Sequence, residues 1–260
     1  MQETVIQSTA NPLIKRIRGL NQKKNREKEK RYLADGPHLT QEAVRYAKVE
    51  RVLIREGEEI PAWLADVPFS IVSAHVMEAV SDTVTPQGML AVVEKEEQTL
   101  PEECSGLVCV LDAVADPGNV GTIVRTADAA GAACVILSAG CADVFSPKTV
   151  RSTMGSLFHL PVIQTDRPAA EVIRHFQKMG YLAAGTHLKG VPVFETDIPW
   201  KKDMLFVTGN EAHGMSDEAS DSCNLLLKLP ILGKAESLNA AVATGIFLYQ
   251  WVEKTKGGNV

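Results

Sequence analysis

Apolar residues in the second half of the chain form short continuous runs, and segments with a helical period separate these runs. Short continuous runs are typical of strands buried on both faces of a parallel sheet. Predicted strands are Leu107–Asp112, Cys134–Leu137, Pro161–Gln164, Tyr181–Thr186, Met204–Thr208 and Leu225–Leu229. Predicted helices are Val120–Ala130, Pro168–Met179 and Ser237–Lys254. This alternation predicts an α/β domain with a parallel sheet.

The first part of the chain mixes both patterns on a smaller scale. Helical patterns cover Leu13–Leu20 and His38–Ala47, and a charged helix is predicted to run as far as Tyr32. Strand-like runs lie at Val52–Ile54, Phe69–Val72 and Met89–Val93. Residues 94–105 are acidic, contain one proline and have no periodicity. We therefore expect a domain of residues 1–97, a linker at 98–105 and a domain of residues 106–260.

The composition favours a protein of the cytoplasm. No apolar run approaches the roughly 18 residues of a membrane span, and the N-terminal residues lack the apolar core of a signal peptide. The five cysteines are odd in number and contain no CxxC pair, which is typical of a reducing compartment. We expect no membrane association and no metal site.

Charge is distributed unevenly along the chain, whose net charge is −5. Nine basic and two acidic residues between Lys15 and Arg31 give that segment a charge of +7, which leaves −12 for the remainder. A basic segment on an acidic protein indicates contact with nucleic acid, although a solvated helix face is the alternative. The RNA contacts predicted from this segment are Lys15, Arg16, Arg18, Lys23, Lys24 and Arg26.

Polar loops follow three of the predicted strands, at the ends where ligands of parallel sheets collect. The first loop, Asp116–Gly121, offers Asn119 as a helix cap and leads to Arg125, for which a surface pair with Asp128 is the alternative. In the second, Glu211 lies between Gly209 and Gly214. It could bind backbone N–H groups or a ligand amine, or it could be a solvated side chain in a tight turn.

The third loop connects the run ending at Leu229 to the last predicted helix. Ser237 or Glu236 is the expected N-cap of that helix, and Gly245 within the helix indicates close packing. Alone, this stretch is as typical of an ordinary strand–loop–helix as it is of a turn that binds a small polar ligand. The chain has no GxGxxG after a strand, no GxxxxGK[ST] and no GxSxG, so the corresponding dinucleotide, nucleotide-triphosphate and hydrolase sites are unsupported.

The three loops together resemble the motifs of the SpoU/TrmH-type RNA ribose 2′-O-methyltransferases of the SPOUT class. The resemblance covers about residues 105–255, and the N-terminal part is more loosely similar to the family's substrate-binding domain. It rests on Asn119-x5-Arg125, Gly209-Asn210-Glu211-x-x-Gly214 and Pro230-x-x-Gly233 leading to Ser237-Leu238-Asn239. Ala212 and Ala241 depart from the pattern, because many members carry a glycine and a small hydroxyl residue there.

The resemblance implies a parallel-sheet SPOUT domain with a C-terminal trefoil knot, preceded by a small α/β RNA-binding domain. It also implies a homodimer, packed at the helix that contains Gly245, and S-adenosylmethionine as the cofactor. By resemblance, the cofactor is bound by Thr186, Gly209, Leu229, Ile231 and Leu238. Arg125 is catalytic by the same resemblance, and Asn119, Glu211, Ser237 and Asn239 position it, the ribose or the loops.

Arg125 has two possible roles in this chemistry. In the family's proposal it acts as a base after a substrate phosphate assists its deprotonation. Because guanidinium is essentially never neutral in proteins, Arg125 could instead stay charged, bind a phosphate and polarise the hydroxyl. By analogy with the family we expect ribosomal RNA rather than transfer RNA as the substrate. Two other hypotheses are a non-catalytic RNA-binding or ribosome-associated protein and a nucleotide-cofactor enzyme acting on small molecules.

Overall fold

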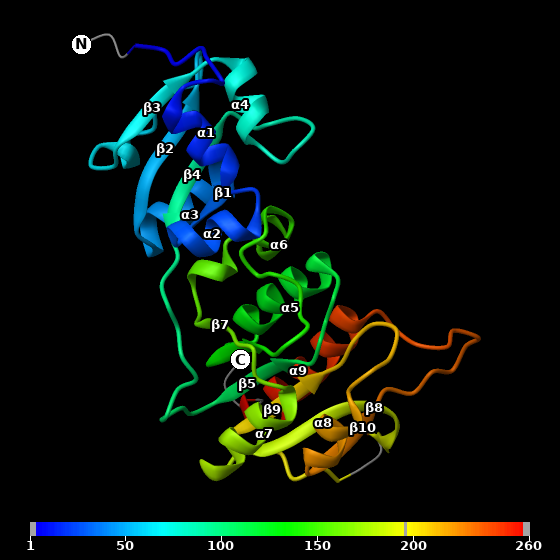
Figure 1. Cartoon of the computed structure of the whole chain (residues 1–260). Coiled ribbons are helices and arrows are strands. Elements are labelled where there is room, and N and C mark those ends of the chain that lie inside the picture. The colour runs from blue at the N-terminus through cyan, green and yellow to red at the C-terminus, as the bar shows by residue number, and fades with distance from the viewer. Residues whose placement is uncertain (1–3, 195–196, 257–260) are drawn as a thin grey trace. The chain divides into compact units, whose positions relative to one another are not determined.

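The computed structural model describes residues 4–194 and 197–256 and divides the chain into two compact units. The first unit contains the residues up to Glu97 together with Asp143–His159. The second contains Gln98–Ala142 and the residues from Leu160 onward. Figure 1 traces the chain through both. The segment Asp143–His159 therefore folds with the first unit, although it interrupts the sequence of the second.

The first unit is built on a four-stranded sheet with the strand order β1-β4-β2-β3. Strand β4 is antiparallel to β1 and β2, whereas β2 and β3 are parallel. The strands are β1 (Arg31–Asp35), β2 (Val49–Arg55), β3 (Phe69–Val72) and β4 (Met89–Glu94). The helices are α1 (Pro12–Gly19), α2 (Lys23–Glu29), α3 (Pro37–Tyr46), α4 (Ala74–Val80) and α6 (Pro147–Thr153), with 3₁₀ turns η1 (Ala62–Leu64) and η2 (Ser156–Phe158). One core cluster joins apolar residues of α1 and α4 to the sheet.

The helix expected to run to Tyr32 is shorter than predicted. It ends at Glu29, because Lys30 adopts a left-handed conformation with φ 52°. The next five residues form β1, in which Tyr32 pairs with Val93 and is only 4% exposed. Sheet pairing and burial of this apolar segment outweigh the weak local preference of a charged sequence for a helix.

Arg26 holds the inserted segment Asp143–His159 to α2. Its Nη2 donates to Asp143 Oδ2 at 2.5 Å, and its Nη1 donates to the carbonyl oxygens of Leu20 and Asn21 at 2.8 and 2.9 Å. The two charged side chains are only 4% and 11% exposed. Arg26 is thus a buried structural cation, and its guanidinium is not available for the predicted RNA contact.

The first prediction concerns this buried ion pair. Asp143→Asn keeps the shape of the side chain but leaves the guanidinium of Arg26 without an anionic acceptor, so we expect a loss of about 2 kcal/mol in the free energy of unfolding. Asp82→Asn is the matched control, because the Asp82 carboxylate pairs with Arg151 on the same segment but is 49% exposed. The control should lose roughly 0.5 kcal/mol or less. Equal losses in denaturant titrations of the two variants would contradict the assignment.

The second unit contains a six-stranded sheet with the order β10-β8-β9-β5-β6-β7. Every pair of neighbouring strands is parallel, which confirms the predicted parallel α/β sheet. The strands are β5 (Leu107–Leu111), β6 (Cys134–Leu137), β7 (Val162–Gln164), β8 (Leu182–Pro192), β9 (Met204–Thr208) and β10 (Leu225–Lys228). The helices are α5 (Pro117–Ala129), α7 (Ala169–Lys178), α8 (Asp217–Ser222) and α9 (Ala240–Lys256).

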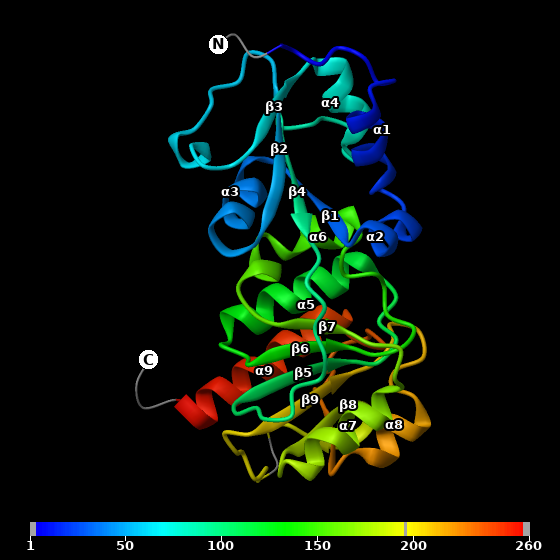
Figure 2. The ribbon, with the colours of Figure 1, turned by 60° about the vertical axis from the view of Figure 1, so that its left-hand side comes forward.

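Helices cover both faces of this sheet. Figure 2 shows α5 and α9 on one face and α7 and α8 on the other. From β5 the chain proceeds through α5 to β6 and then to β7, away from β9. Strand β9 lies on the opposite side of β5 and leads into α8, on the face of the sheet opposite to α5. Strands β5 and β9 therefore flank the point where the winding direction reverses, which is where open α/β sheets bind their ligands. None of the described helices is both long and apolar enough to cross a membrane.

Candidate functional site

The loop after β5 places Asn119 inside the first turn of α5. The N-cap of α5 is Asp116, whose Oδ1 accepts a hydrogen bond from the backbone N–H of Asn119 at 2.9 Å. The expectation that Asn119 caps this helix is therefore wrong, because Pro117 is a favoured first helical residue and moves the start forward. The side chain of Asn119 is left available for tertiary contacts.

Glu211, from the loop after β9, binds the loop after β5. Its Oε1 accepts from the Asn119 side-chain amide at 2.8 Å and from the Asp116 backbone N–H at 3.1 Å. Its Oε2 accepts from the Ala115 N–H at 3.1 Å. Partial burial acts to raise the pKa of the Glu211 carboxyl, but the hydrogen bonds from Asn119 and the backbone outweigh it, so that its pKa is lowered. The carboxylate joins the two strand ends at which the sheet reverses its winding.

The loop that carries Glu211 is a tight backbone turn. Asn210 and Gly214 exchange two backbone hydrogen bonds of 2.8 and 2.9 Å, and Asn210 Oδ1 accepts from the N–H groups of Ala212 and His213. A Cβ atom on Gly209 would lie 2.1 Å from the backbone nitrogen of Met215, so only glycine fits there. Ala212 takes part in the turn through its N–H, so the departure from the family pattern leaves this contact intact.

Asn239, rather than Ser237 or Glu236, caps the last helix. The helix begins at Ala240, and Asn239 Oδ1 accepts from the N–H groups of Ala241 and Val242 at 2.9 and 3.2 Å. Asn239 Nδ2 donates to Asn119 Oδ1 at 2.8 Å. The cap moves to Asn239 because its side chain can accept from the helix and donate to Asn119 at once. Ser237 is exposed and lies outside the helix.

A continuous chain of side-chain hydrogen bonds therefore links the three predicted loops, from Glu211 through Asn119 to Asn239. To reach Asn119, the chain must travel from β10 at the edge of the sheet past β8 and β9 to β5. Three strand spacings of about 4.8 Å make this a crossing of roughly 14 Å. The segment Leu229–Leu238 makes that crossing at the carboxyl ends of the strands.

This crossing segment has open backbone groups and uncovered apolar side chains. Among the described residues, none donates or accepts a hydrogen bond with residues 230–238. Leu238 is 40% exposed, and Leu229 and Ile231 are half-buried. Thr186 follows Gly185, where the pairing of β8 with β9 ends and the register of β8 with β10 shifts. The crossing segment, Thr186 and Gly209 together offer apolar side chains and backbone N–H and C=O groups. Such a combination fits a ligand that has both a nucleoside and polar groups.

Arg125 lies on the exposed face of α5. None of the described residues forms an ion pair or hydrogen bond with its guanidinium, so the alternative of a surface pair with Asp128 is not observed. Thr122, one helical turn earlier, is also exposed. Helical side chains lean toward the N-terminus, so Arg125 is directed back over Thr122 toward the end of β5. The site thus presents an unpaired cation near the loops that Glu211 and Asn119 hold together.

The sequence alone did not single out Asp112 or the pair Thr208 and Thr244. Asp112 is 6% exposed, and its Oδ2 accepts from the Ser216 N–H at 2.7 Å and from the Ser216 hydroxyl at 2.9 Å. The hydroxyl groups of Thr208 and Thr244 lie 2.7 Å apart and connect β9 to α9. The only available signal was the acidic residue that ends the apolar run LVCVLD. Asp112 connects the end of β5 to the start of α8, and the threonine pair connects β9 to α9, so these contacts support the strand ends that carry the site.

The predicted RNA contacts on α1 and α2 differ in their availability. Arg16 donates to Glu29 and, through both terminal nitrogens, to Glu50, and with Arg31 it lowers the pKa of Glu50 to about 2. The remaining four side chains are exposed and form no ion pair with another described residue: Lys15, Arg18, Lys23 and Lys24. These four remain available for phosphate contacts.

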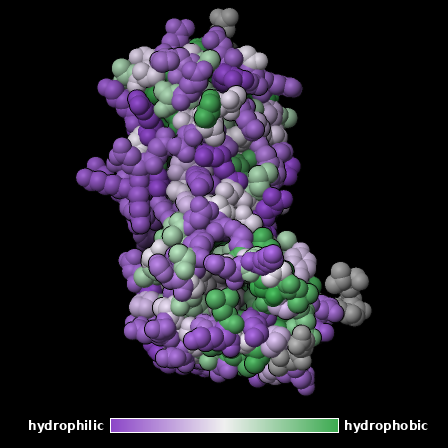
Figure 3. Space-filling view, turned by 90° about the vertical axis from the view of Figure 1, so that its right-hand side faces the viewer, coloured by the Kyte–Doolittle hydropathy of each residue, from purple (hydrophilic) through white to green (hydrophobic). Residues whose placement is uncertain are grey.

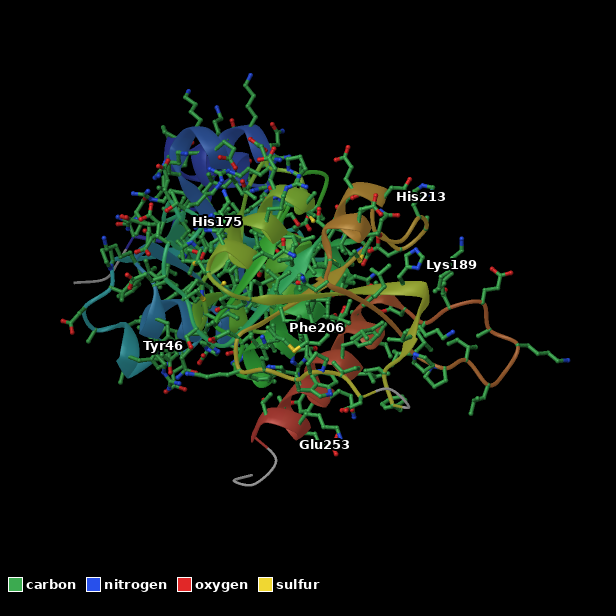
Figure 4. The ribbon with its side chains drawn as sticks, turned by 90° about the horizontal axis from the view of Figure 1, so that it is seen from below. Tyr46, His175, Lys189, Phe206, His213 and Glu253 are labelled. Carbon is green, nitrogen blue, oxygen red and sulfur yellow. The ribbon has the colours of Figure 1, made fainter. Side chains whose placement is uncertain are left out.

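Exposed apolar side chains gather on the face of the second unit that carries the crossing segment (Figure 3). The exposed large apolar side chains of the second unit are Leu188, Val191, Phe194, Leu232, Leu238, Val242 and Tyr249. In Figure 4, His213 and Lys189 lie at the periphery of this unit, whereas Phe206 is central. Gly245 faces α5, because a Cβ there would lie 3.4 Å from Thr126 Cγ2. No group of three or more potential metal-ligating side chains occurs within residues 4–194 and 197–256.

The second prediction concerns the charge of Glu211. Glu211→Gln replaces an acceptor oxygen by a donor facing the same N–H groups, so we expect the binding constant for the site's ligand to fall about tenfold at pH 7. Because the folded pKa of Glu211 is lowered, its contribution to the free energy of unfolding is complete above the ordinary value of 4.5 and is lost as the pH falls through the folded pKa. Denaturant titrations from pH 7 to acid should show this loss of stability for the native chain and not for Glu211→Gln. An identical acid limb in Glu211→Gln would contradict the role.

The chain resembles known proteins over nearly its whole length. Residues 106–249 match the model of the SpoU rRNA Methylase family, and residues 11–91 match that of the MRM3-like substrate binding domain. The chain is 37% identical to the 23S rRNA (guanosine(2553)-2′-O)-methyltransferase RlmP of Bacillus subtilis, across 94% of this chain and 97% of that protein. It is 32% identical to the 23S rRNA (uridine(2479)-2′-O)-methyltransferase of Streptomyces viridochromogenes, across 90% and 88%. The crystal structure of an AdoMet-bound rRNA methyltransferase from Sinorhizobium meliloti matches with a TM-score of 0.85 and 32% identity, across 97% and 98%.

Proposed function

The chain belongs to the SpoU rRNA methylase family, and on that basis we propose that it methylates the ribose 2′-hydroxyl of a nucleotide in ribosomal RNA. It is an S-adenosylmethionine-dependent RNA 2′-O-methyltransferase. The observation that carries the site assignment is the hydrogen-bond chain from Glu211 through Asn119 to Asn239, which joins three loops at the reversal point of the sheet. Arg125 lies on the helix that begins at the first of these loops.

S-adenosylmethionine supplies an electrophilic methyl group bound to a sulfonium. We propose that Thr186, Gly209, Leu229, Ile231 and Leu238 hold it. The open backbone groups of residues 230–238 suit the polar ends of the cofactor, and the apolar side chains suit its adenosine. Transfer of the methyl group to oxygen removes the positive charge of the sulfonium. An apolar pocket therefore favours the transfer, because it stabilises the neutral thioether product better than the charged sulfonium. No protein nucleophile is needed for a direct displacement.

The chain's own task is to orient the 2′-hydroxyl and to remove its proton. Arg125 is the proposed residue for this task, because it is exposed, unpaired among the described residues and directed toward the strand ends. In its charged form it binds a substrate phosphate through two donors and polarises the hydroxyl. Asn119, Glu211 and Asn239 hold the loops in place, and exposed Ser237 is proposed to contact the ribose. A base role for Arg125 is the alternative, and Arg125→Lys tests whether the planar fork of the charged form is needed.

We propose that residues 1–97 form the RNA-binding domain and residues 106–260 the methyltransferase domain, joined by residues 98–105. The match of residues 11–91 to a substrate binding domain supports this division. The four exposed and unpaired cations Lys15, Arg18, Lys23 and Lys24 are the proposed phosphate contacts. We also propose that the protein acts in the cytoplasm, where ribosomal RNA would be its substrate.

We further propose that the C-terminal part forms a trefoil knot and that the protein is a homodimer. The crossing from β10 to Asn119 over the ends of β8 and β9 supports the knot, an exception to the rule against threaded chains. Val242 and Tyr249, two helical turns apart on α9, are 53% and 51% exposed and offer an apolar face for a second copy. A monomer in light scattering would contradict the homodimer.

The experiment that tests the proposed function combines transfer and mapping. The protein is incubated with S-adenosylmethionine carrying a labelled methyl group and with 23S rRNA or with tRNA, and the label in RNA is counted. Resistance of one phosphodiester bond to alkaline hydrolysis then identifies the 2′-O-methylated nucleotide. Incorporation into rRNA and not into tRNA is expected. Incorporation into tRNA alone would contradict the proposal that ribosomal RNA is the substrate. No incorporation into either RNA would contradict the proposed methyltransferase activity.

A further inference from the structure

A stripe of three side chains runs along one face of α3 in the first unit. His38, Glu42 and Tyr46 are spaced four residues apart and therefore lie above one another. The end of the inserted segment lies along this stripe. His38 Nε2 donates to the carbonyl oxygen of Met154 at 3.1 Å, and His159 Nε2 donates to Glu42 Oε2 at 2.8 Å.

Tyr46 is the exposed end of this stripe. It is 60% exposed, yet its ring is held edge-on by the imidazole of His159, with ring centroids 5.0 Å apart and an interplanar angle of 75°. His159 is itself anchored to Glu42, whose side chain is only 11% exposed. Tyr46 can be located on α3 in Figure 4. An aromatic ring that is already ordered loses little conformational entropy when a second flat group stacks on it.

Two exposed cations lie close to Tyr46 along the chain. Arg45 and Lys48 are both exposed, and Lys48 forms no ion pair with another described residue. Arg45 Nη1 lies 3.4 Å from Glu42 Oε1, a long contact that leaves most of its donors free. Proteins bind single-stranded nucleic acid by stacking its bases on exposed aromatic rings and by contacting its phosphates with nearby cations.

We propose that Tyr46 is a stacking platform for an unpaired nucleobase of the RNA substrate, held in place by His159 and Glu42 and flanked by Arg45 and Lys48 for the adjacent phosphates. The site lies outside the α1 and α2 cations already assigned to RNA. It rests on the proposed function only in that the substrate is RNA. The cations favour RNA over a second copy of this chain, for which an apolar surface without charges would be suited.

The experiment measures methyl transfer to an rRNA fragment with full-length variants. Tyr46→Ala should raise the KM for RNA about tenfold, the size expected from loss of one stacked base, and leave kcat at saturating RNA unchanged. Tyr46→Phe and Tyr46→Trp keep a flat ring and should retain a near-native KM. Ile60→Ala, which shortens another apolar side chain of this unit that is 48% exposed, is the matched control and should leave KM unchanged. Thermal melting of each variant verifies the fold.

Two further measurements separate stacking from a structural effect. The fluorescence of the Tyr46→Trp variant should be quenched more strongly than that of the native chain, which carries Trp63, Trp200 and Trp251, on addition of an unlabelled single-stranded fragment of the rRNA substrate. His159→Ala should raise KM about threefold, and the double variant with Tyr46→Ala should be no worse than Tyr46→Ala alone, because both act through one ring. An unchanged KM in Tyr46→Ala or absence of quenching would overturn the platform. A change of oligomeric state in Tyr46→Ala would also overturn it, in favour of a contact between copies. Failure of the native chain to methylate any RNA would instead overturn the proposed function.

Discussion

Replacing Arg125 by alanine is expected to lower kcat for methyl transfer by about a thousandfold, the middle of the range for loss of a positioned proton-handling group. The reason lies in its surroundings. The guanidinium is exposed, has no partner among the described residues and projects from the helix whose first turn carries Asn119. Its removal takes nothing from the fold, so the melting temperature and the binding constant for S-adenosylmethionine should stay near their native values.

Arg125→Lys separates two chemical roles of this residue. Lysine keeps a positive charge but lacks the planar fork, so a role that needs two parallel donors predicts a large loss of kcat in this variant as well. Near-native turnover of Arg125→Lys would contradict that role. Arg167→Ala removes another exposed arginine of the same unit and should leave kcat unchanged. Equal kcat values for Arg125→Ala and the native chain would remove Arg125 from the site.

Gly209→Ala should destabilise the second unit by about 3 kcal/mol and weaken S-adenosylmethionine binding by more than tenfold. The added methyl group would lie 2.1 Å from the Met215 nitrogen and 2.2 Å from the Gly214 carbonyl carbon. Both are backbone atoms, so no change of rotamer relieves the overlap, and the turn that presents Glu211 must open. A fall in melting temperature on the order of 10 °C corresponds to this loss.

Gly233→Ala is the matched control for this substitution. No atom lies within 4 Å of a Cβ at position 233, and the residue belongs to the crossing segment. Its melting temperature should equal that of the native chain. Calorimetric titration with S-adenosylmethionine and thermal melting of both variants measure the two effects. A stable Gly209→Ala variant with native affinity would show that the turn yields without consequence.

The strands of the second unit could be predicted because the backbone repeat dictates which side chains are buried. A strand covered on both faces buries every residue, as in β5, where all five residues are buried. The corresponding helices show an apolar stripe for the same reason. These signals are local, so one sequence suffices to locate the elements. Helix boundaries were less certain, because two or three neighbouring residues can serve as a cap, as with Asp116 and Asn119 or with Ser237 and Asn239.

Errors arose where a distant contact decided the local structure. Arg31–Asp35 carries charged ends and follows a charged helix, yet it forms β1 because β4 offers it an edge. Arg26 is one of nine similar cations in its segment, and only the approach of Asp143, 117 residues further along the chain, makes it a buried structural residue. Likewise, no local pattern marks Asp143–His159 as part of the first unit.

For the candidate site, the residues capable of binding or catalysis could be predicted from motifs and strand ends. The resemblance to one family then assigned a role to each of them. Their contacts were not evident, because strand order in a parallel sheet is set by the packing of helices on both faces rather than by any strand's own residues. The order β10-β8-β9-β5 brings Glu211 to Asn119 across 92 residues and Asn239 to Asn119 across 120. Local physics therefore accounts for the elements and for the residues at their ends, whereas only the folded sheet joins those residues into one site.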